Sequence, residues 1–369
     1  MPALTCTHCG AEVHHSEADQ IGSETICRTC AAAYTRVCDC CGERIWAEDD
    51  RGDESTVLCE ECCHSYYVRC TRCGRLMEVR EAYYGEEDDD EEYPYCSDCF
   101  HQIEETIHCY SYKPEPVFHG NGSRYFGVEL EVDEGGRDRE NARNILKIFN
   151  EEKEYGYIKS DGSLNDGMEL VTHPCTLQAH QEEVPWAETL QCFKQMGYYS
   201  HQASTCGLHV HVNRTAFGKT EQEQDEGIGH VLYLFERFWQ EMLRFSRRTQ
   251  RQVEQWAARY GYKDSGREIL KTAKAGYQGR YTCVNLLNRD TIEFRIFRGT
   301  LKHSTLIATL QMIDWICNVA IIFTEEKLQA MSWAELMLNI CKEEYPELVQ
   351  YLKERRLYIN EPVTAEREV

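Results

Sequence analysis

Three segments of the chain alternate strictly between apolar and polar residues: Gly127–Val132, Gly207–Asn213 and Thr291–Phe297. Period-two alternation predicts a β-strand with one face on a hydrophobic core. Two further segments, Tyr157–Leu164 and Met168–Val171, predict a strand that enters a turn and a short additional strand. We therefore expect a sheet with one apolar face and one polar face.

Longer segments between and after these strands have helical periodicity. Arg139–Glu152 and the stretch from Gln222 to about Tyr260 are amphipathic, and Ser332–Leu357 predicts helices that close the chain. Leu306–Phe323 is mostly apolar but contains Gln311, Asp314 and Asn318, which favours a buried helix of a soluble protein over a membrane span. The combination predicts an α+β fold in which an antiparallel sheet forms an open trough with flanking helices.

The first hundred residues contain a different pattern, a threefold repeat of cysteine pairs. Cys6-Thr-His-Cys9-Gly10 recurs twice at steps of 32 residues, and a second pair follows each copy. The predicted tetrads are Cys6, Cys9, Cys27 and Cys30; Cys38, Cys41, Cys59 and Cys62; and Cys70, Cys73, Cys96 and Cys99. Modules of about 30 residues bury too little apolar surface to fold alone. Three in-register repeats therefore predict three structural zinc ions, with iron–sulfur clusters or redox thiols as alternatives.

Changes in composition along the chain predict its domain boundaries, and a few cysteines lie outside the predicted tetrads. We expect zinc modules at about 1–35, 36–67 and 68–110, a linker rich in proline and glycine at 111–124, and a catalytic domain at 125–369. Outside the tetrads lie further candidate ligands, namely Cys40, Cys63, Cys109, His8 and His64.

Charge is as uneven as cysteine content. The whole chain carries −23, and residues 1–110 hold 25 Asp and Glu against 8 Arg and no Lys, a net charge of −17. Nucleic-acid binding needs clustered cations, so zinc-dependent DNA or RNA recognition is disfavoured. No apolar export segment follows Met1, which predicts a cytoplasmic protein in which thiols stay reduced.

The polar faces of the predicted strands carry unusual residues for solvent-exposed positions. They present Glu-x-Glu, His-x-His-x-Asn and Glu-x-Arg, spaced about 7 Å apart along each strand. A solvated outer face remains the alternative for any one strand taken alone. Converging carboxylates and imidazoles suit Mg²⁺ or Mn²⁺, and arginines suit phosphate. The chain has neither a P-loop nor a Gly-x-Gly-x-x-Gly motif.

Four motifs in order resemble the amidoligase family of the carboxylate–amine ligase superfamily, whose better-known relatives are glutamine synthetase and glutamate–cysteine ligase. They are Phe-Gly-Val-Glu-Leu-Glu; Ser-Asp-Gly-Ser-Leu with Glu-Leu-Val-Thr-His-Pro; Cys-Gly-Leu-His-Val-His-Val-Asn; and Val-Asn-Leu with Thr-Ile-Glu-Phe-Arg-Ile-Phe-Arg-Gly-Thr-Leu. The resemblance covers about residues 124–325. The zinc modules lie outside it.

The resemblance implies an ATP-dependent ligase that forms an amide through an acyl phosphate. It implies that divalent ions are held by Glu129, Glu131, Glu169, His209 and Glu293. It further implies that Arg295 and Arg298 stabilise the transferred phosphoryl group, that His211 and Asn213 contact nucleotide or substrate, and that Asp161 orients the amine or takes its proton. The substrates are a carboxylate and an amine, which a peptide or protein could supply.

For several of these residues, a purely structural role remains the alternative. Asp161 could form only a turn, His211 could be structural, and Arg298 could pair with a neighbouring acid. Cys206 lies close to His209 in sequence, but no orienting Asn or Asp marks a thiol protease. For the whole chain, the alternatives are a zinc-containing interaction protein that binds nucleotide without chemistry, and a phosphoryl-transfer enzyme that does not ligate.

Overall fold

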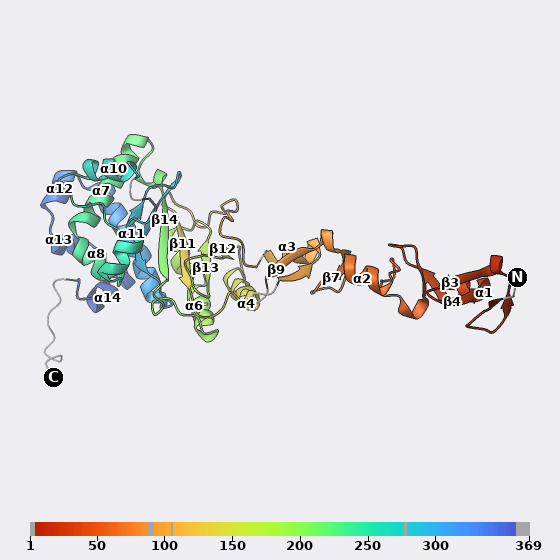
Figure 1. Cartoon of the computed structure of the whole chain (residues 1–369). Helices are drawn as coiled ribbons and strands as arrows, with labels where there is room; N and C mark the ends of the chain where they lie inside the picture. The colour runs from red at the N-terminus through yellow and green to blue at the C-terminus, as the bar shows by residue number, and fades with distance from the viewer. Residues whose placement is uncertain (1–3, 87–91, 105, 277–278, 359–369) are drawn as a thin grey trace. The chain divides into compact units, whose positions relative to one another are not determined.

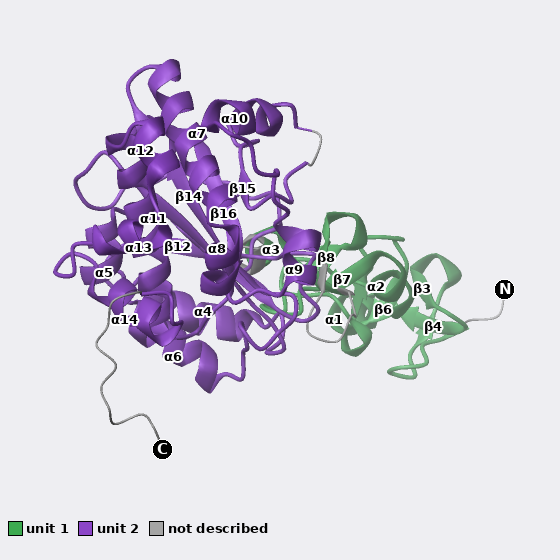
Figure 2. Ribbon diagram, turned by 90° about the vertical axis from the view of Figure 1, so that its left-hand side faces the viewer, with its two compact units in different colours: residues 1–105 green, residues 106–369 purple. Residues whose placement is uncertain are grey.

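The computed structural model describes residues 4–86, 92–104, 106–276 and 279–358, and the chain divides into two compact units. Unit 1 covers residues 1–105 and unit 2 covers residues 106–369 (Figure 2). Figure 1 labels the helices and strands along the chain.

Unit 1 repeats a small β-hairpin followed by a short helix. The first module contains β1 (Leu4–Thr5), β2 (Glu12–Val13), η1 (His15–Glu17), β3 (Ala18–Ile21), β4 (Glu24–Cys27) and α1 (Arg28–Tyr34). The second contains β5 (Thr35–Val37), β6 (Arg44–Trp46), η2 (Ala47–Asp49) and α2 (Glu60–Tyr66). The third contains β7 (Tyr67–Arg69), β8 (Leu76–Glu78), η3 (Val79–Glu81), β9 (Tyr83–Glu86), β10 (Glu92–Tyr95) and α3 (Ser97–Glu104). Trp46 packs on the core of the first module and Leu76 on that of the second, so neighbouring modules share apolar contacts.

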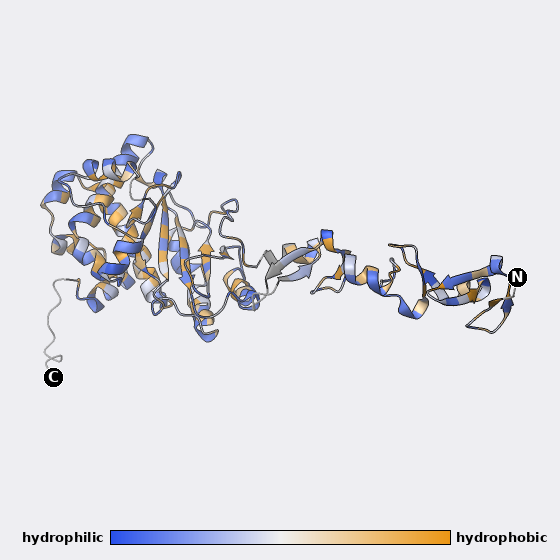
Figure 3. Cartoon of the chain, in the orientation of Figure 1, coloured by the Kyte–Doolittle hydropathy of each residue, from blue (hydrophilic) through white to orange (hydrophobic). Residues whose placement is uncertain are grey.

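Unit 2 is built on a six-stranded sheet in the order β12-β13-β11-β14-β16-β15, with every neighbouring pair antiparallel. The strands are β11 (Phe126–Val132), β12 (Gly156–Lys159), β13 (Met168–Thr172), β14 (Gly207–Asn213), β15 (Val284–Asn285) and β16 (Thr291–Arg298). Apolar and polar residues alternate along β11, β14 and the first part of β16 (Figure 3). Val128, Leu130 and Val132 of β11 lie fully buried in one large core, as period two requires. The predicted mixed fold with an antiparallel sheet is confirmed.

Helices complete this core. Before β16 they are α4 (Arg139–Phe149), α5 (Leu177–Glu182), α6 (Trp186–Gln195), η4 (Arg214–Phe217), α7 (Glu221–Arg237), α8 (Trp239–Ser246), α9 (Gln250–Trp256) and α10 (Gly266–Lys274). After it come α11 (His303–Ile322), α12 (Glu325–Ala330), α13 (Trp333–Leu338) and α14 (Pro346–Glu354). The amphipathic stretch from Gln222 to Tyr260 forms three helices, because Phe238 separates α7 from α8 and the left-handed residue Arg247 (φ 65°) ends α8.

Helix α11 corresponds to the apolar segment Leu306–Phe323, which the sequence predicted to be a buried helix. By length and composition alone its 20 residues could cross a membrane, but 72% of its most apolar window is buried inside unit 2. That burial is typical of the core helix of a globular domain.

The segment after the zinc modules belongs to unit 2. The backbone N–H of His108 donates to the carbonyl of Ile158 (2.9 Å), and that of His119 donates to the carbonyl of Pro174 (2.9 Å). The segment 111–124, which we expected to form a linker, is therefore bonded to unit 2 at His119, and His108 just before it pairs with β12.

Candidate functional site: three thiol clusters and an acidic cluster on the sheet

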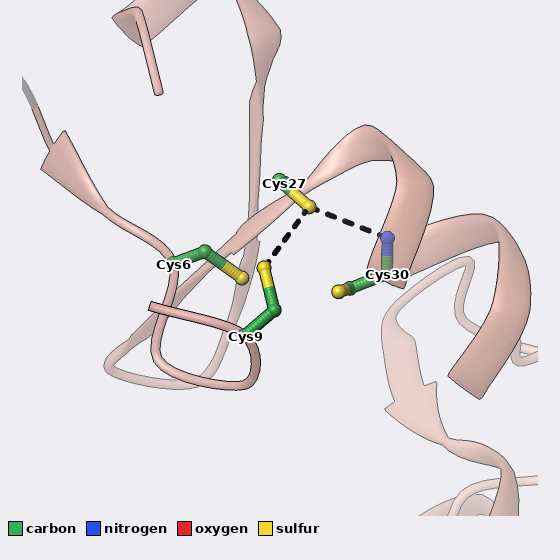
Figure 4. Close-up of side chains that lie close together, drawn as sticks. All are labelled: Cys6, Cys9, Cys27 and Cys30. Atoms are coloured by element: carbon green, nitrogen blue, oxygen red, sulfur yellow. Dashed lines mark hydrogen bonds between the residues drawn. The ribbon is translucent and has the colours of Figure 1, made fainter. Parts of the chain in front are cut away.

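The three predicted cysteine tetrads are each brought together by the same local structure. The first pair of a module lies in the turn of its hairpin, and the second pair lies at the start of its helix; Figure 4 shows this for Cys6, Cys9, Cys27 and Cys30. In each tetrad four sulfur atoms lie within 4.8 Å of one another. The glycines after the hairpin pairs are left-handed, with φ of 75° at Gly10, 77° at Gly42 and 74° at Gly74. Each donates its N–H back to the first cysteine's carbonyl, which closes the turn.

The sulfur spacing fits a tetrahedral zinc site. Zn–S bonds of about 2.3 Å place the sulfurs of a tetrahedron about 3.8 Å apart. The recorded separations are 3.9 Å for Cys9–Cys27, 3.8 Å for Cys41–Cys59 and 3.8 Å for Cys73–Cys96. Of the extra candidates, Cys63 donates to the carbonyl of Arg51 and the ring of His8 contacts that of Tyr34 at a tilt of 38°, so both have other contacts.

A second cluster forms on the polar face of the sheet in unit 2. The strand register places Glu129 opposite His209, Glu131 opposite Glu169, and His211 opposite Glu293. Four strands, β11, β13, β14 and β16, thus present acidic and imidazole side chains to one patch. The five predicted metal ligands, Glu129, Glu131, Glu169, His209 and Glu293, all lie in it.

Two groups of ligand atoms stand out in this acidic cluster. Glu129, Glu169 and His209 form one, Glu129, His211 and Glu293 form another, and each keeps its ligand atoms within 4.8 Å. Nδ1 of His209 lies 3.4 Å from Oε2 of Glu129 and 3.8 Å from Oε1 of both Glu131 and Glu293. Buried like charges at this density need compensating cations. Oxygen and imidazole donors are those that Mg²⁺ and Mn²⁺ accept, so the residues present fit such ions.

Neighbouring charges set the protonation of the cluster. Burial raises the pKa of Glu169 well above its usual range, and the Glu129 carboxylate adds to the effect. Burial also opposes ionisation of Glu129, but His211, His209 and Lys159 together outweigh it and lower that pKa well below its usual range. Burial lowers the pKa of His211, but the charge and hydrogen bond of Glu129 together with the charge of Glu293 exceed that effect and raise it. Without a cation the cluster therefore keeps protons that a divalent ion would displace.

Arginines border the acidic cluster. Nη1 of Arg295 donates to Oε1 of Glu293, while the Nε atoms of Arg295 and Arg298 are buried without a hydrogen-bond partner among the described residues. Arg248 is buried beside Gly207 and Glu131, and burial lowers its pKa to about 10 although Glu131 acts in the opposite direction. Buried guanidinium groups with unused donors are suited to bind phosphate.

Two predicted residues are engaged elsewhere. The Asn213 amide accepts from the N–H of Tyr125 (2.8 Å) and donates to the carbonyl of Ser123 (2.9 Å), so it holds the entry of β11. Oδ1 of Asp161 accepts from both the N–H and the hydroxyl of Ser163, at 2.6 Å each, which is a local turn. Contacts between Asp161 and the acidic cluster are not found in the part of the chain that the structure describes.

The structure adds three residues that sequence reasoning missed. Nζ of Lys159 lies 3.1 Å from Oε2 of Glu169, and Nδ2 of Asn285 donates to Oε2 of Glu293 at 2.8 Å. Lys159 follows the same period-two rule as the predicted ligands and could have been found from it. Arg248 could not, because it comes from the irregular end of α8 and only the fold brings it to β14.

Comparison with known proteins agrees with the motif analysis. Residues 147–317 match the model of a family described as "Putative amidoligase enzyme", which confirms the predicted family resemblance. The strand with Glu129 and Glu131 precedes the matched residues but pairs with two strands inside them. No curated protein matches the chain.

Two solved structures are similar at low identity. A bifunctional glutathione synthetase from Pasteurella multocida is 14% identical with a TM-score of 0.33, over 63% of this chain and 46% of that one. The ligase PafA, solved in complex with the prokaryotic ubiquitin-like protein Pup, is 10% identical with a TM-score of 0.29, over 66% of this chain and 59% of that one. The present chain thus spans about half the length of these proteins.

Proposed function

We propose that the chain is an ATP-dependent ligase that joins a carboxylate to an amine with the help of Mg²⁺ or Mn²⁺. The observation that carries the proposal is the gathering of four glutamates and two histidines on the polar face of one antiparallel sheet, with arginines at its border. The match of residues 147–317 to the amidoligase family supports the reaction class.

Two cation positions follow from the two ligand groups, which share Glu129. One would use Glu169 and His209, and the other His211 and Glu293, with Glu131 beside them. When bound, the ions would neutralise the triphosphate and the transferring phosphoryl group. We propose that the polar face is an open trough that admits ATP over these positions.

The arginines would hold the phosphates. Arg295, Arg298 and Arg248 place three guanidinium groups near the acidic cluster, and the unpartnered Nε atoms of the first two can donate to phosphoryl oxygens. His211, whose Nδ1 lies 3.2 Å from Oγ1 of Thr291, stays a candidate for nucleotide or substrate contact.

The proposed chemistry has two steps. An oxygen of the substrate carboxylate attacks the γ-phosphorus of ATP, the bond to ADP breaks, and an acyl phosphate forms. The amine nitrogen then attacks the acyl carbon, phosphate leaves with the bonding electrons, and the amine loses a proton to a base. Asp161 remains the predicted base; reaching the amine would require it to leave its turn with Ser163.

The zinc modules would recruit a partner. Their −17 charge suits a basic protein or peptide, which could supply the amine. We further propose that the protein acts in the cytoplasm, where free thiols and zinc thiolates persist.

Release of ADP and phosphate tests this function. The wild type with ATP, Mg²⁺ and pools of amino acids and peptides should release both, and Glu293→Gln should release neither because a ligand and its charge are lost. Glu188→Gln on the exposed side of α6 is the matched control. ADP without free phosphate would instead favour a kinase, and absence of nucleotide binding would leave an interaction protein.

A further inference from the structure

Cations and aromatic rings alternate along the rim of the acidic cluster. Nζ of Lys159 lies 5.6 Å from the ring centre of Tyr110, and Cζ of Arg280 lies 5.7 Å from the same ring. Cζ of Arg280 also lies 5.0 Å from the ring of Tyr281, which Arg295 approaches at 5.8 Å. Because Lys159 pairs with Glu169 and Arg295 pairs with Glu293, both ends of this rim join the acidic cluster.

Tyr110 reaches the rim from the edge of the sheet. His108 forms a parallel bridge with Lys159 of β12, and the N–H of Ser160 donates to the carbonyl of His108 at 2.8 Å. The ring of His108 stacks on Tyr112 with centroids 3.6 Å apart, which fixes the residues on both sides of Tyr110. Tyr110 thus lies in a turn that an isolated bridge anchors to the edge strand β12.

Arg280 is the exposed member of the rim. Its guanidinium donates to the hydroxyls of Tyr110 and Tyr281, the latter at 3.1 Å. Among the residues that the structure describes, no carboxylate pairs with Arg280. In a chain with 63 acidic and 40 basic residues, an exposed arginine held in place by two neutral hydroxyls keeps its charge available for a ligand.

The negative charge of the acidic cluster makes a free cation at its entrance favourable for binding an anionic substrate. A carboxylate substrate must approach four glutamates in a protein of charge −23, and cations at the entrance reduce that repulsion. Of the rim cations, Lys159 and Arg295 already neutralise glutamates of the cluster. Only Arg280 among the three can pair with an incoming anion without giving up an acidic partner.

We propose that Arg280, held between Tyr110 and Tyr281, receives an acidic peptide segment and pairs with one carboxylate while a neighbouring carboxylate is activated at the acidic cluster. This inference rests on the proposed ligase function. It names the substrate that supplies the carboxylate as a peptide or protein with at least two acidic groups. The acidic zinc modules would then be left to attract the basic partner.

Peptide binding tests the inference without turnover. The full zinc-loaded chain is titrated, with Mg²⁺ and a non-hydrolysable ATP analogue, into fluorescein-labelled hexaglutamate, and anisotropy gives the affinity. The wild type should bind hexaglutamate more tightly than hexaglutamine. Arg280→Gln should weaken hexaglutamate binding about tenfold or more, since a charge-assisted hydrogen bond is lost. Arg280→Lys should retain most of the affinity.

Two further variants secure the interpretation. Tyr110→Phe removes only the hydroxyl that positions Arg280 and should weaken binding severalfold, whereas Arg267→Gln on the exposed side of α10 should leave it unchanged. Equal binding by wild type and Arg280→Gln, or no binding by wild type, would overturn the inference. ADP release from ATP, measured on the same protein preparations, reports separately on the ligase function. If ADP release is unchanged in Arg280→Gln, the ligase function stands and only the inference about Arg280 fails. If peptide binding depends on Arg280 but no ADP is released, the ligase function is contradicted.

Discussion

Replacing Gly207 with alanine should disable the acidic cluster while the fold survives. Gly207 begins β14, and its N–H donates to Oε2 of Glu131. An added Cβ would lie 2.6 Å from Nε2 of His209, 2.7 Å from Nη2 of Arg248 and 3.2 Å from Oε2 of Glu131. The close approach of three functional groups to one backbone position therefore requires glycine.

The size of the effect follows from these distances. Ordinary contact with a Cβ begins at 3.4 Å, so the His209 and Arg248 atoms must retreat by about 0.8 and 0.7 Å. Both are the ends of side chains that can turn aside, so the free energy of unfolding should fall by only about 1–2 kcal/mol relative to wild type. A misplacement approaching 1 Å at a catalytic site costs about a hundredfold in rate. We expect Mn²⁺ affinity and ADP release to fall by about ten- to a hundredfold.

Isothermal titration with Mn²⁺, ADP release and thermal unfolding measure the three quantities on one preparation. Gly127→Ala is the matched control on the neighbouring strand, because its Cβ would meet only Cβ of His211 at 3.6 Å and the carbonyl of Thr172 at 4.0 Å. Gly207→Ala with Mn²⁺ affinity and ADP release within twofold of wild type would refute the assignment of His209 and Glu131 to the metal site.

Two other predictions concern stability. Cys59→Ser should lower bound zinc from about three to about two ions per chain and unfold the second module, whose buried residue besides cysteines is Leu58, while the melting of unit 2 stays unchanged. Zinc content that stays at three would count against the tetrad. Asp133 is fully buried, and its carboxylate accepts from the N–H groups of Glu134, Asn165 and Asp166 and from the Thr205 hydroxyl. Asp133→Ala should therefore cost about 2–4 kcal/mol in urea unfolding, and a loss below 1 kcal/mol would show that these loops do not depend on it.

The sequence predicted what depends on local spacing. Period two placed Glu129, His209 and Glu293 on one face of their strands, and the pairing of the strands made that face a single patch. The cysteine spacing likewise defined the tetrads, since hairpin and helix start are set within each module.

What the sequence could not supply depends on tertiary contacts. Arg248 and Tyr110 come from irregular segments whose positions are fixed only by distant strands. The second break in the stretch from Gln222 to Tyr260 falls at Arg247, whose guanidinium donates to the carbonyl of Arg298 at the end of β16. A local sequence pattern gives no information about such a distant partner. It likewise could not show that the Asn213 side chain accepts a hydrogen bond from the backbone N–H of Tyr125.

Trapping the activated carboxylate would show directly whether the chain forms an acyl phosphate. Hydroxylamine offered as the amine, with ATP, Mg²⁺ and peptides containing several glutamates, converts an acyl phosphate to a stable hydroxamate. We predict one hydroxamate and one phosphate for each ADP in the wild type, and none of the three products with Glu293→Gln. ADP formed by the wild type without hydroxamate, or hydroxamate that persists in Glu293→Gln, would contradict this prediction.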